Sequence, residues 1–282
     1  MTTAPRTPRE RVEAALRNTL IAAGFFEAAT MSFVEQSLLD CFRLWSQAKP
    51  LAVDHSSRRQ ENLLRQSLVP SLLAARQLNE SRGTMDSELF EMAGVYLPWK
   101  AQEGARRMEG QNMDSILPDE RHHLALVTSR GLGELKGVLE NLLVQLHATE
   151  PLQARAVHRP EFAAGRGAEM RIGEDLVGFF GQISDKLAAQ FDLRTSCSVA
   201  ELNLAQLEAV AQLIPQHRAI PNQPASQREL SLIVDETVLW SSVESLVRTS
   251  AGPHLESIRF FDLYRGRPIP TGKKSLHFGL TY

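Results

Sequence analysis

A proline-rich polar segment constrains this chain more than any other feature of its sequence. Three prolines lie close together between residues 215 and 224, and most of the residues around them are polar. Because proline has no backbone N–H and a fixed φ, neither a helix nor a central strand continues through such a segment. The segment therefore predicts an extended connector over residues 213–228. We place a domain boundary at its start and expect two domains, residues 1–212 and 213–282.

The larger domain shows helix and strand signals in an irregular order. Thr7-Pro8, with Glu10 three residues after the cap, predicts a helix start, and Gly24 predicts its end. Because strands and helices do not alternate regularly, the mixture favours an α+β fold in which helices flank an antiparallel sheet. Further helices are expected over 69–81 and along the apolar stripe 135–146, and strands over 88–97, 123–129, 168–172, 175–183 and 196–202.

The smaller domain has the order strand, helix, strand, strand. Ser241 and Glu244 have the spacing of a capping box, and Gly252 follows the predicted helix. This order is three-quarters of a ferredoxin-like βαββαβ unit. Because the chain stops at Tyr282, we expect an incomplete β-α-β-β module without a second helix and last strand. Its strands are expected over 230–234, 255–264 and 274–282.

Composition excludes several classes of protein. With 43% hydrophobic and 23% charged residues, the chain has the composition of a globular protein rather than a disordered or fibrous one. Its apolar stretches are too short to span a bilayer, so we expect no membrane association. Cys41 and Cys197 are too few for a disulfide framework, and no secretory signal opens the chain. We expect a cytoplasmic protein.

Charge is unevenly distributed between the two domains. Residues 213–282 carry eight Lys and Arg against six Asp and Glu, although the whole chain has a net charge of -2. Within residues 259–274, five basic residues accompany a single acid. Such a cluster is either a solvated loop or an edge that faces an anionic partner.

No motif predicts catalysis or metal binding. Gly165-Arg166-Gly167 resembles a phosphate loop, but it does not follow a clear strand and open a helix, so we interpret it as a loop-to-strand turn. His122-His123 has no acidic or thiol partner at ligand spacing, whereas zinc needs three or four converging ligands. We therefore assign no catalytic residue and no metal ligand.

Two segments of the smaller domain resemble a known family. The run FDLYRG at 261–266, followed by PIPTGKKSL at 268–276, closely resembles the hallmark of the ferredoxin-fold anticodon-binding domain of bacterial phenylalanyl-tRNA synthetase β subunits. The segment PASQRELSLIV at 224–234 is similar to the first strand of that domain. Matches to the same subunit follow in order upstream, at residues 24–28, 64–73, 89–92, 135–140 and 178–183.

The resemblance implies a role for each domain. Residues 1–212 would form a catalytically inert copy of the class II synthetase fold that packs against the catalytic α subunit, in a heterotetramer of two α and two β subunits. Residues 213–282 would bind the anticodon region of tRNA(Phe). ATP and magnesium are implied for the whole enzyme, and no cofactor for this part. Leu89-Phe90-Glu91 lacks the arginine that class II enzymes place before this Phe/Glu pair, and Gln223 and Gln227 replace an aromatic residue and an arginine usual in the family.

The resemblance also suggests which residues contact tRNA. Anticodon bases are single-stranded, so their recognition needs a ring for stacking and cations for the phosphates. Tyr264 is the candidate ring; alternatively, it is a core residue at a strand end and the cations only confer solubility. The candidate cations are Arg228, Arg265, Arg267, Lys273 and Lys274.

Two other functions stay open from the sequence. The chain is alternatively a stand-alone class II-like ligase, which would bind ATP, or a generic ferredoxin-like module that binds RNA or protein. A group of aromatic residues in the larger domain is either ordinary core or part of a protein-binding face. That group comprises Phe25, Phe26, Phe33, Phe42 and Trp45.

Overall fold

The computed structural model describes residues 5–53, 61–98, 118–214 and 224–282. The chain forms two compact units, unit 1 (Met1–Pro215) and unit 2 (Gln216–Tyr282). Most of the predicted connector, residues 215–223, lies outside the described residues. None of the helices in the described ranges combines the length and hydropathy needed to cross a bilayer.

Unit 1 is built around one seven-stranded sheet with the strand order β1-β4-β5-β9-β8-β7-β6. Its neighbouring strands are antiparallel, as predicted, except that β1 pairs with β4 in parallel. The strands are β1 (Phe26–Glu27), β4 (Leu89–Leu97), β5 (Asp119–Thr128), β6 (Gln153–Ala156), β7 (Phe162–Ile172), β8 (Asp175–Ile183) and β9 (Ser198–Asn203).

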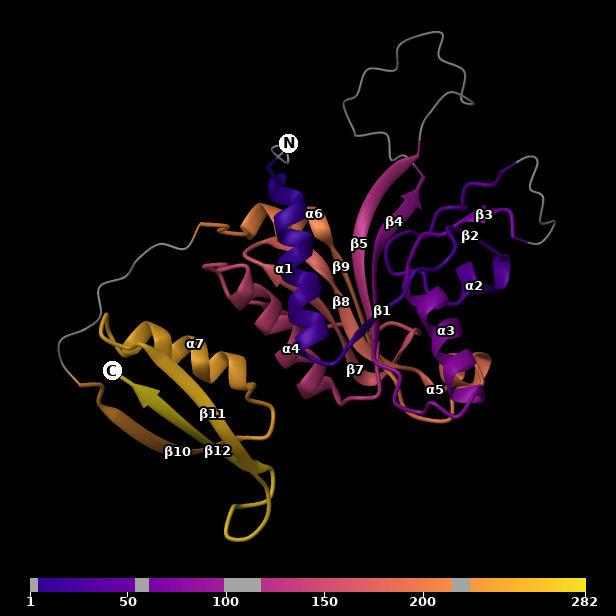
Figure 1. Ribbon diagram of the computed structural model, residues 1–282. Helices are drawn as coiled ribbons and strands as arrows, with labels where there is room; N and C mark the ends of the chain where they lie inside the picture. Colours follow the sequence, from indigo (N-terminus) through magenta and orange to yellow (C-terminus); the bar gives the residue numbers. More distant parts are fainter. Residues whose placement is uncertain (1–4, 54–60, 99–117, 215–223) are drawn as a thin grey trace, which may run out of the picture. The chain divides into compact units, whose positions relative to one another are not determined.

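Helices cover both faces of this sheet (Figure 1). One face packs against α1 (Pro8–Ala22), α4 (Leu132–Gln145) and α6 (Leu204–Val210), and the other packs against α3 (Val69–Ser81) and α5 (Asp185–Gln190). Successive strand residues therefore contribute to two separate apolar cores, because neighbouring side chains point to opposite faces. Beside α3 lie α2 (Gln36–Asp40) and a short pair of strands, β2 (Phe33–Val34) and β3 (Leu63–Leu64).

The predicted start of α1 is confirmed in atomic detail. The Glu10 backbone N–H donates to Thr7 Oγ1 at 3.2 Å, and the Thr7 N–H donates to Glu10 Oε2 at 2.7 Å. Gly24 follows the helix with φ +88°, a conformation that glycine adopts without strain. The predicted bounds of α3 are also confirmed.

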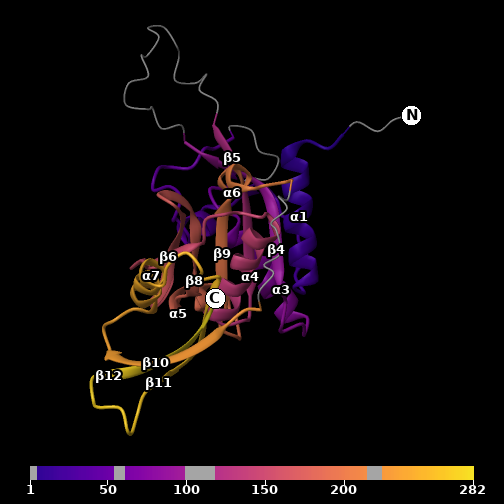
Figure 2. The same cartoon turned by 90° about the vertical axis from the view of Figure 1, so that its left-hand side faces the viewer.

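Unit 2 has the predicted order of strand, helix, strand, strand. Its three-stranded antiparallel sheet has the order β10-β12-β11, and α7 packs across one face (Figure 2). Val243 from the helix joins Leu276, Phe278 and Leu280 from the central strand in the core. The elements are β10 (Gln227–Asp235), α7 (Trp240–Ser250), β11 (Ser257–Tyr264) and β12 (Lys273–Thr281).

Two local predictions are wrong. The helix α7 does not use the predicted capping box at Ser241, because it begins at Trp240, whose ring packs on Phe260 and Phe278 at 4.9 and 5.2 Å. Gly165-Arg166-Gly167 lies inside β7, at an irregularity of its register with β8, rather than in a turn that leads into a strand. A Cβ on Gly167 would lie 2.3 Å from the Phe162 ring, so this glycine makes room for an aromatic side chain.

Candidate nucleic-acid interface

Five of the six predicted tRNA-binding residues lie around the loop that joins β11 to β12. Tyr264 ends β11, and Lys273 begins β12. Arg228 does not join them, because it pairs in register with Leu280 near the opposite end of β12. Leu280 is seven positions along that strand from Lys273, which is about 23 Å at 3.3 Å per residue. The β11–β12 edge, defined as residues 264–274, is therefore the candidate interface.

Tyr264 is exposed at this edge. Its residue is 48% exposed, and its hydroxyl donates to the backbone carbonyl of Arg267 at 2.7 Å. It pairs in register with Ser275, on the face of the sheet opposite α7. The hydrogen bond positions the ring while leaving much of its surface accessible, which is the arrangement that stacking on a base requires.

Two cations of the edge form exposed ion pairs. Arg265 Nη2 lies 2.6 Å from Glu236 Oε1, and Lys273 Nζ lies 3.3 Å from Asp235 Oδ1. The hydrogen bond between Arg265 and Glu236 lowers the pKa of the carboxyl and raises the pKa of the guanidinium. Exposed pairs of this kind contribute little free energy, so phosphate oxygens can compete for both cations.

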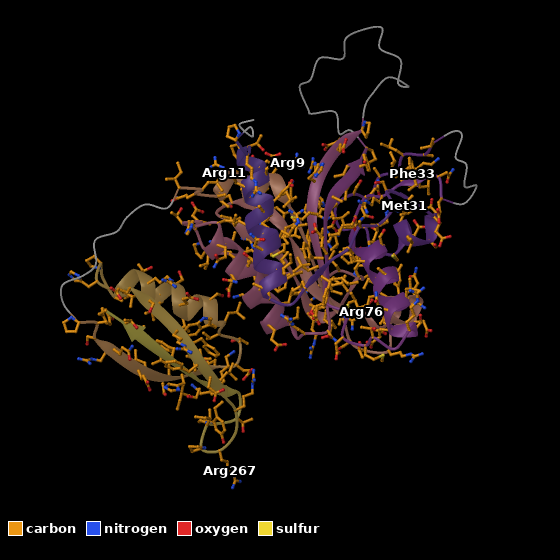
Figure 3. The ribbon with its side chains drawn as sticks, viewed as in Figure 1. Arg9, Arg11, Met31, Phe33, Arg76 and Arg267 are labelled. Carbon is orange, nitrogen blue, oxygen red and sulfur yellow. The ribbon has the colours of Figure 1, made fainter. Side chains whose placement is uncertain are left out.

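The two remaining cations have opposite environments. Arg267 extends from the loop in Figure 3 and has no ion pair with any residue in the described ranges. Lys274 is buried, at 7% exposure, and its Nζ donates to the backbone carbonyl of Glu236 at 2.8 Å. Lys273 precedes it in β12 and points to the opposite face of the sheet, so the two lysines cannot both reach a phosphate on the open face. Lys274 supports the edge from below and is not presented to a phosphate.

An irregularity in β11 decides which rings are exposed. The register with β12 shifts between Phe260 and Asp262, which leaves Phe261 as an extra residue in a β-bulge. Strict alternation would place Tyr264 with Phe260 on the α7 face, whereas the bulge turns Tyr264 to the open face. Phe261 is exposed on that same face and was missed by sequence reasoning. Its position within the FDLYRG run was the available signal.

A second polar site lies on the α3 face of the unit 1 sheet. Glu91 accepts hydrogen bonds from the Thr30 backbone N–H at 3.1 Å and from Arg65 Nη1 at 3.1 Å, and the Arg65 and Glu91 side chains are each 3% exposed. Nearby, Glu201 accepts hydrogen bonds from Ser67 Oγ at 2.6 Å and from the Leu68 N–H at 3.0 Å, and its Oε1 lies 2.9 Å from His123 Nδ1. His123 Nε2 is buried without a hydrogen-bond partner among the described residues. The Arg65 donors are engaged within the unit, and two carboxylates face this site, so it does not fit a nucleotide phosphate.

The aromatic residues near the start of unit 1 divide into two sets. Phe25 and Phe42 belong to the core, at 2% and 3% exposure, and Trp45 is partly buried. Phe26 and Phe33 are exposed, at 69% and 40%. Phe33 and Met31, which is 59% exposed, are labelled in Figure 3, and both line a surface pocket of about 170 Å³. We call Met31 and Phe33 the apolar patch.

No group of three or more His, Cys, Asp and Glu side chains within the described ranges is arranged to hold a metal ion. His123 is buried against Glu201, as described above. Its neighbour His122 points to the other face of β5, where burial lowers its pKa. The two histidines therefore do not converge on one site.

Comparison with known proteins assigns a family to each unit. Residues 1–204 match the family described as "Phenylalanyl tRNA synthetase beta chain CLM domain", and residues 221–282 match "Ferredoxin-fold anticodon binding domain". Among solved structures, a pyrrolysyl-tRNA synthetase from Desulfitobacterium hafniense superposes with a TM-score of 0.54 and 16% identity, over 72% of this chain and 68% of that one. At this identity the likeness shows the fold alone, which is that of a tRNA synthetase.

Curated relatives agree over nearly the whole chain. A phenylalanine–tRNA ligase beta subunit from Clostridium tetani is 29% identical over 99% of this chain and 34% of its own length. One from Rhodopirellula baltica is 32% identical over 93% of this chain and 38% of its own length. The chain thus spans about a third of the length of these relatives. Because a family match covers residues 1–204, the chain belongs to the phenylalanyl-tRNA synthetase beta chain family.

Proposed function

We propose that this chain is the part of a cytoplasmic phenylalanine–tRNA ligase β subunit that binds the anticodon region of tRNA(Phe) and supports a catalytic α subunit. The observation that carries the proposal is the exposed Tyr264 ring beside Arg265, Arg267 and Lys273. A ring for an unpaired base and cations for its phosphates are what single-stranded RNA requires. The proposal includes ATP and magnesium for the whole enzyme and no cofactor for this part. The paired Arg65 and Glu91 and the occupied Glu201 of unit 1 support it.

Unit 1 would contribute the contact with the α subunit. The apolar patch exposes two large hydrophobic side chains, and Phe26 exposes a third on β1, the edge strand of the sheet. Exposed apolar patches on a folded domain mark surfaces that bind other proteins. The assembly proposed is a heterotetramer of two α and two β subunits, as the family resemblance implies.

The test is binding of the whole chain to an RNA hairpin that carries the anticodon stem-loop of tRNA(Phe), measured against salt concentration. Replacing Tyr264 with leucine should weaken binding by about 1–3 kcal/mol without changing the salt dependence. Replacing Arg265 and Arg267 with alanine should reduce the slope of log K against log salt by roughly 0.7 per lost phosphate contact. Arg248→Ala is the matched control, because Arg248 is an exposed cation on α7.

Three results would contradict the proposal. Equal affinity for a hairpin of unrelated loop sequence would favour a generic RNA-binding module. Parent-like binding by the Tyr264 and arginine variants would place the interface elsewhere. Saturable ATP binding, together with ATP–pyrophosphate exchange that depends on phenylalanine, would favour a stand-alone ligase.

A further inference from the structure

We infer that Phe261 is a second base-stacking ring on the open face of unit 2, so that the module holds two separated bases of the anticodon loop. The inference rests on the proposed function and adds a contact residue to it. It starts from the β-bulge in β11, which turns Phe261 and Tyr264 to the same face although they are three residues apart. In a regular strand, residues with that spacing point to opposite faces.

Close neighbours on the open face fix the position of the Phe261 ring. Gly279 faces one edge of the ring, and a Cβ at this position would come within 2.9 Å of Cε2 and Cζ. The His277 ring lies beside it, with ring centroids 5.1 Å apart. Any larger residue at position 279 would push the ring away. The glycine therefore makes room for the edge of the phenylalanine ring.

Positive charge also lies beside the Phe261 ring. The guanidinium of Arg259 lies 5.6 Å from the Phe261 ring centroid, within the range of a cation–π contact. The same cation is exposed, which leaves it accessible to a phosphate beside a stacked base. His277 is held by Glu229, with Nε2 and Oε2 3.3 Å apart. An exposed ring with a neighbouring cation repeats the chemistry of the Tyr264 site.

Comparison with the preceding residue shows that hydrophobic burial does not explain Phe261. Phe260 and Phe261 are 40% and 42% exposed, but Phe260 packs on Trp240 on the α7 face. Phe261 lies on the other face, which α7 does not cover. An exposed aromatic ring on a helix-free sheet face, beside a cation, has the composition of a single-stranded RNA platform.

The distance between the Phe261 and Tyr264 positions indicates which bases the two rings can stack on. Phe261 contacts Gly279 with its ring edge and lies beside His277, whereas Tyr264 pairs with Ser275. Ser275 is two positions from His277 and four from Gly279 along β12, which is about 7–13 Å at 3.3 Å per residue. Adjacent stacked bases follow one another at about 3.4 Å. The two rings therefore suit two bases that are splayed apart, not neighbours in one stack.

The test compares Phe261→Leu with Phe260→Leu in the whole chain, using the anticodon hairpin of tRNA(Phe) as the probe. Phe261→Leu should raise the Kd by about 5- to 150-fold, as expected for a lost base stack, and leave the salt slope unchanged because no charge is removed. Phe260→Leu changes a residue of similar exposure on the opposite face and should bind like the parent. Phe261→Trp keeps an aromatic ring at position 261 and should also bind like the parent. Circular dichroism of each variant reports whether unit 2 stays folded.

A second measurement changes the RNA and compares the parent chain with Phe261→Leu. Hairpins in which single loop bases are replaced by abasic sites should show two sensitive positions, and Phe261→Leu should abolish the sensitivity at one of them. Parent-like binding by Phe261→Leu while Tyr264→Leu is weakened would overturn this inference and leave the proposed function standing. Equal binding of the parent chain to unrelated hairpins would overturn both.

Discussion

Replacing Arg76 with methionine is expected to destabilise unit 1 by about 3–5 kcal/mol, the cost of breaking a buried ion pair. Arg76 lies on α3 and is fully buried (Figure 3), and its Nε donates to Glu80 Oε1 at 2.9 Å. Its guanidinium also donates to the carbonyls of Met85 and Ser87, each at 3.1 Å, and to Thr195 Oγ1 at 2.8 Å. Methionine keeps the apolar stem but leaves a buried carboxylate without its cation.

The chain offers a matched control. Arg9 and Glu13 on α1 have the same spacing and the same 2.9 Å distance between Nε and Oε1, but their side chains are 47% and 26% exposed. Arg9→Met should therefore cost less than about 0.5 kcal/mol, the range measured for exposed helical pairs. The two pairs differ in burial and in the three further hydrogen bonds that Arg76 donates, so their comparison measures the combined effect of the buried setting.

The assay is urea unfolding read by hydrogen-exchange mass spectrometry of peptides from α3 and β4, which reports on unit 1 separately from unit 2. A variant that also replaces Glu80 with leucine should recover part of the loss, because it removes the uncompensated charge. A loss below about 1 kcal/mol for Arg76→Met, or a double variant less stable than the single one, would refute this reasoning.

Two further predictions concern the proposed partners. Glu236→Gln should tighten binding of the anticodon hairpin at low salt and steepen the salt dependence of binding, because it releases Arg265 from a competing carboxylate. Weaker binding would show instead that the ion pair orders the β11–β12 edge. Met31→Ser with Phe33→Ser should reduce co-purification of the chain with a phenylalanyl-tRNA synthetase α subunit, whereas Leu78→Ser, a change at an exposed leucine on α3, should not. Unchanged capture would move the interface away from the apolar patch.

Local signals allowed several elements to be predicted from the sequence. The start of α1 depends on hydrogen bonds between Thr7 and Glu10, which form within one turn of the chain. The start of α7 could not be predicted in this way. It is decided by Trp240, which packs on Phe260 and Phe278 from two other elements. Spacing alone indicated a capping box at Ser241, but packing between distant residues placed the helix start elsewhere.

The sequence located the candidate interface but did not show which of its charged side chains are accessible. The FDLYRG and GKKS runs identify the β11–β12 edge by resemblance. Lys273 and Lys274 are indistinguishable in those runs, and only one is exposed. The difference arises because neighbouring residues of a strand point to opposite faces, and Glu236 supplies a carbonyl to the buried amine.

The sequence by itself determined the family, the α+β class and the order of the elements in unit 2, because each depends on motifs or periodicity within a short segment. Only the tertiary structure decided that Phe261 and Tyr264 share one face. That outcome depends on a single unpaired residue in β11, which exists only relative to its partner strand β12. The alternation of side chains along β11 alone does not reveal an extra residue in its pairing with β12. The two rings therefore come to share the open face only when the sheet forms.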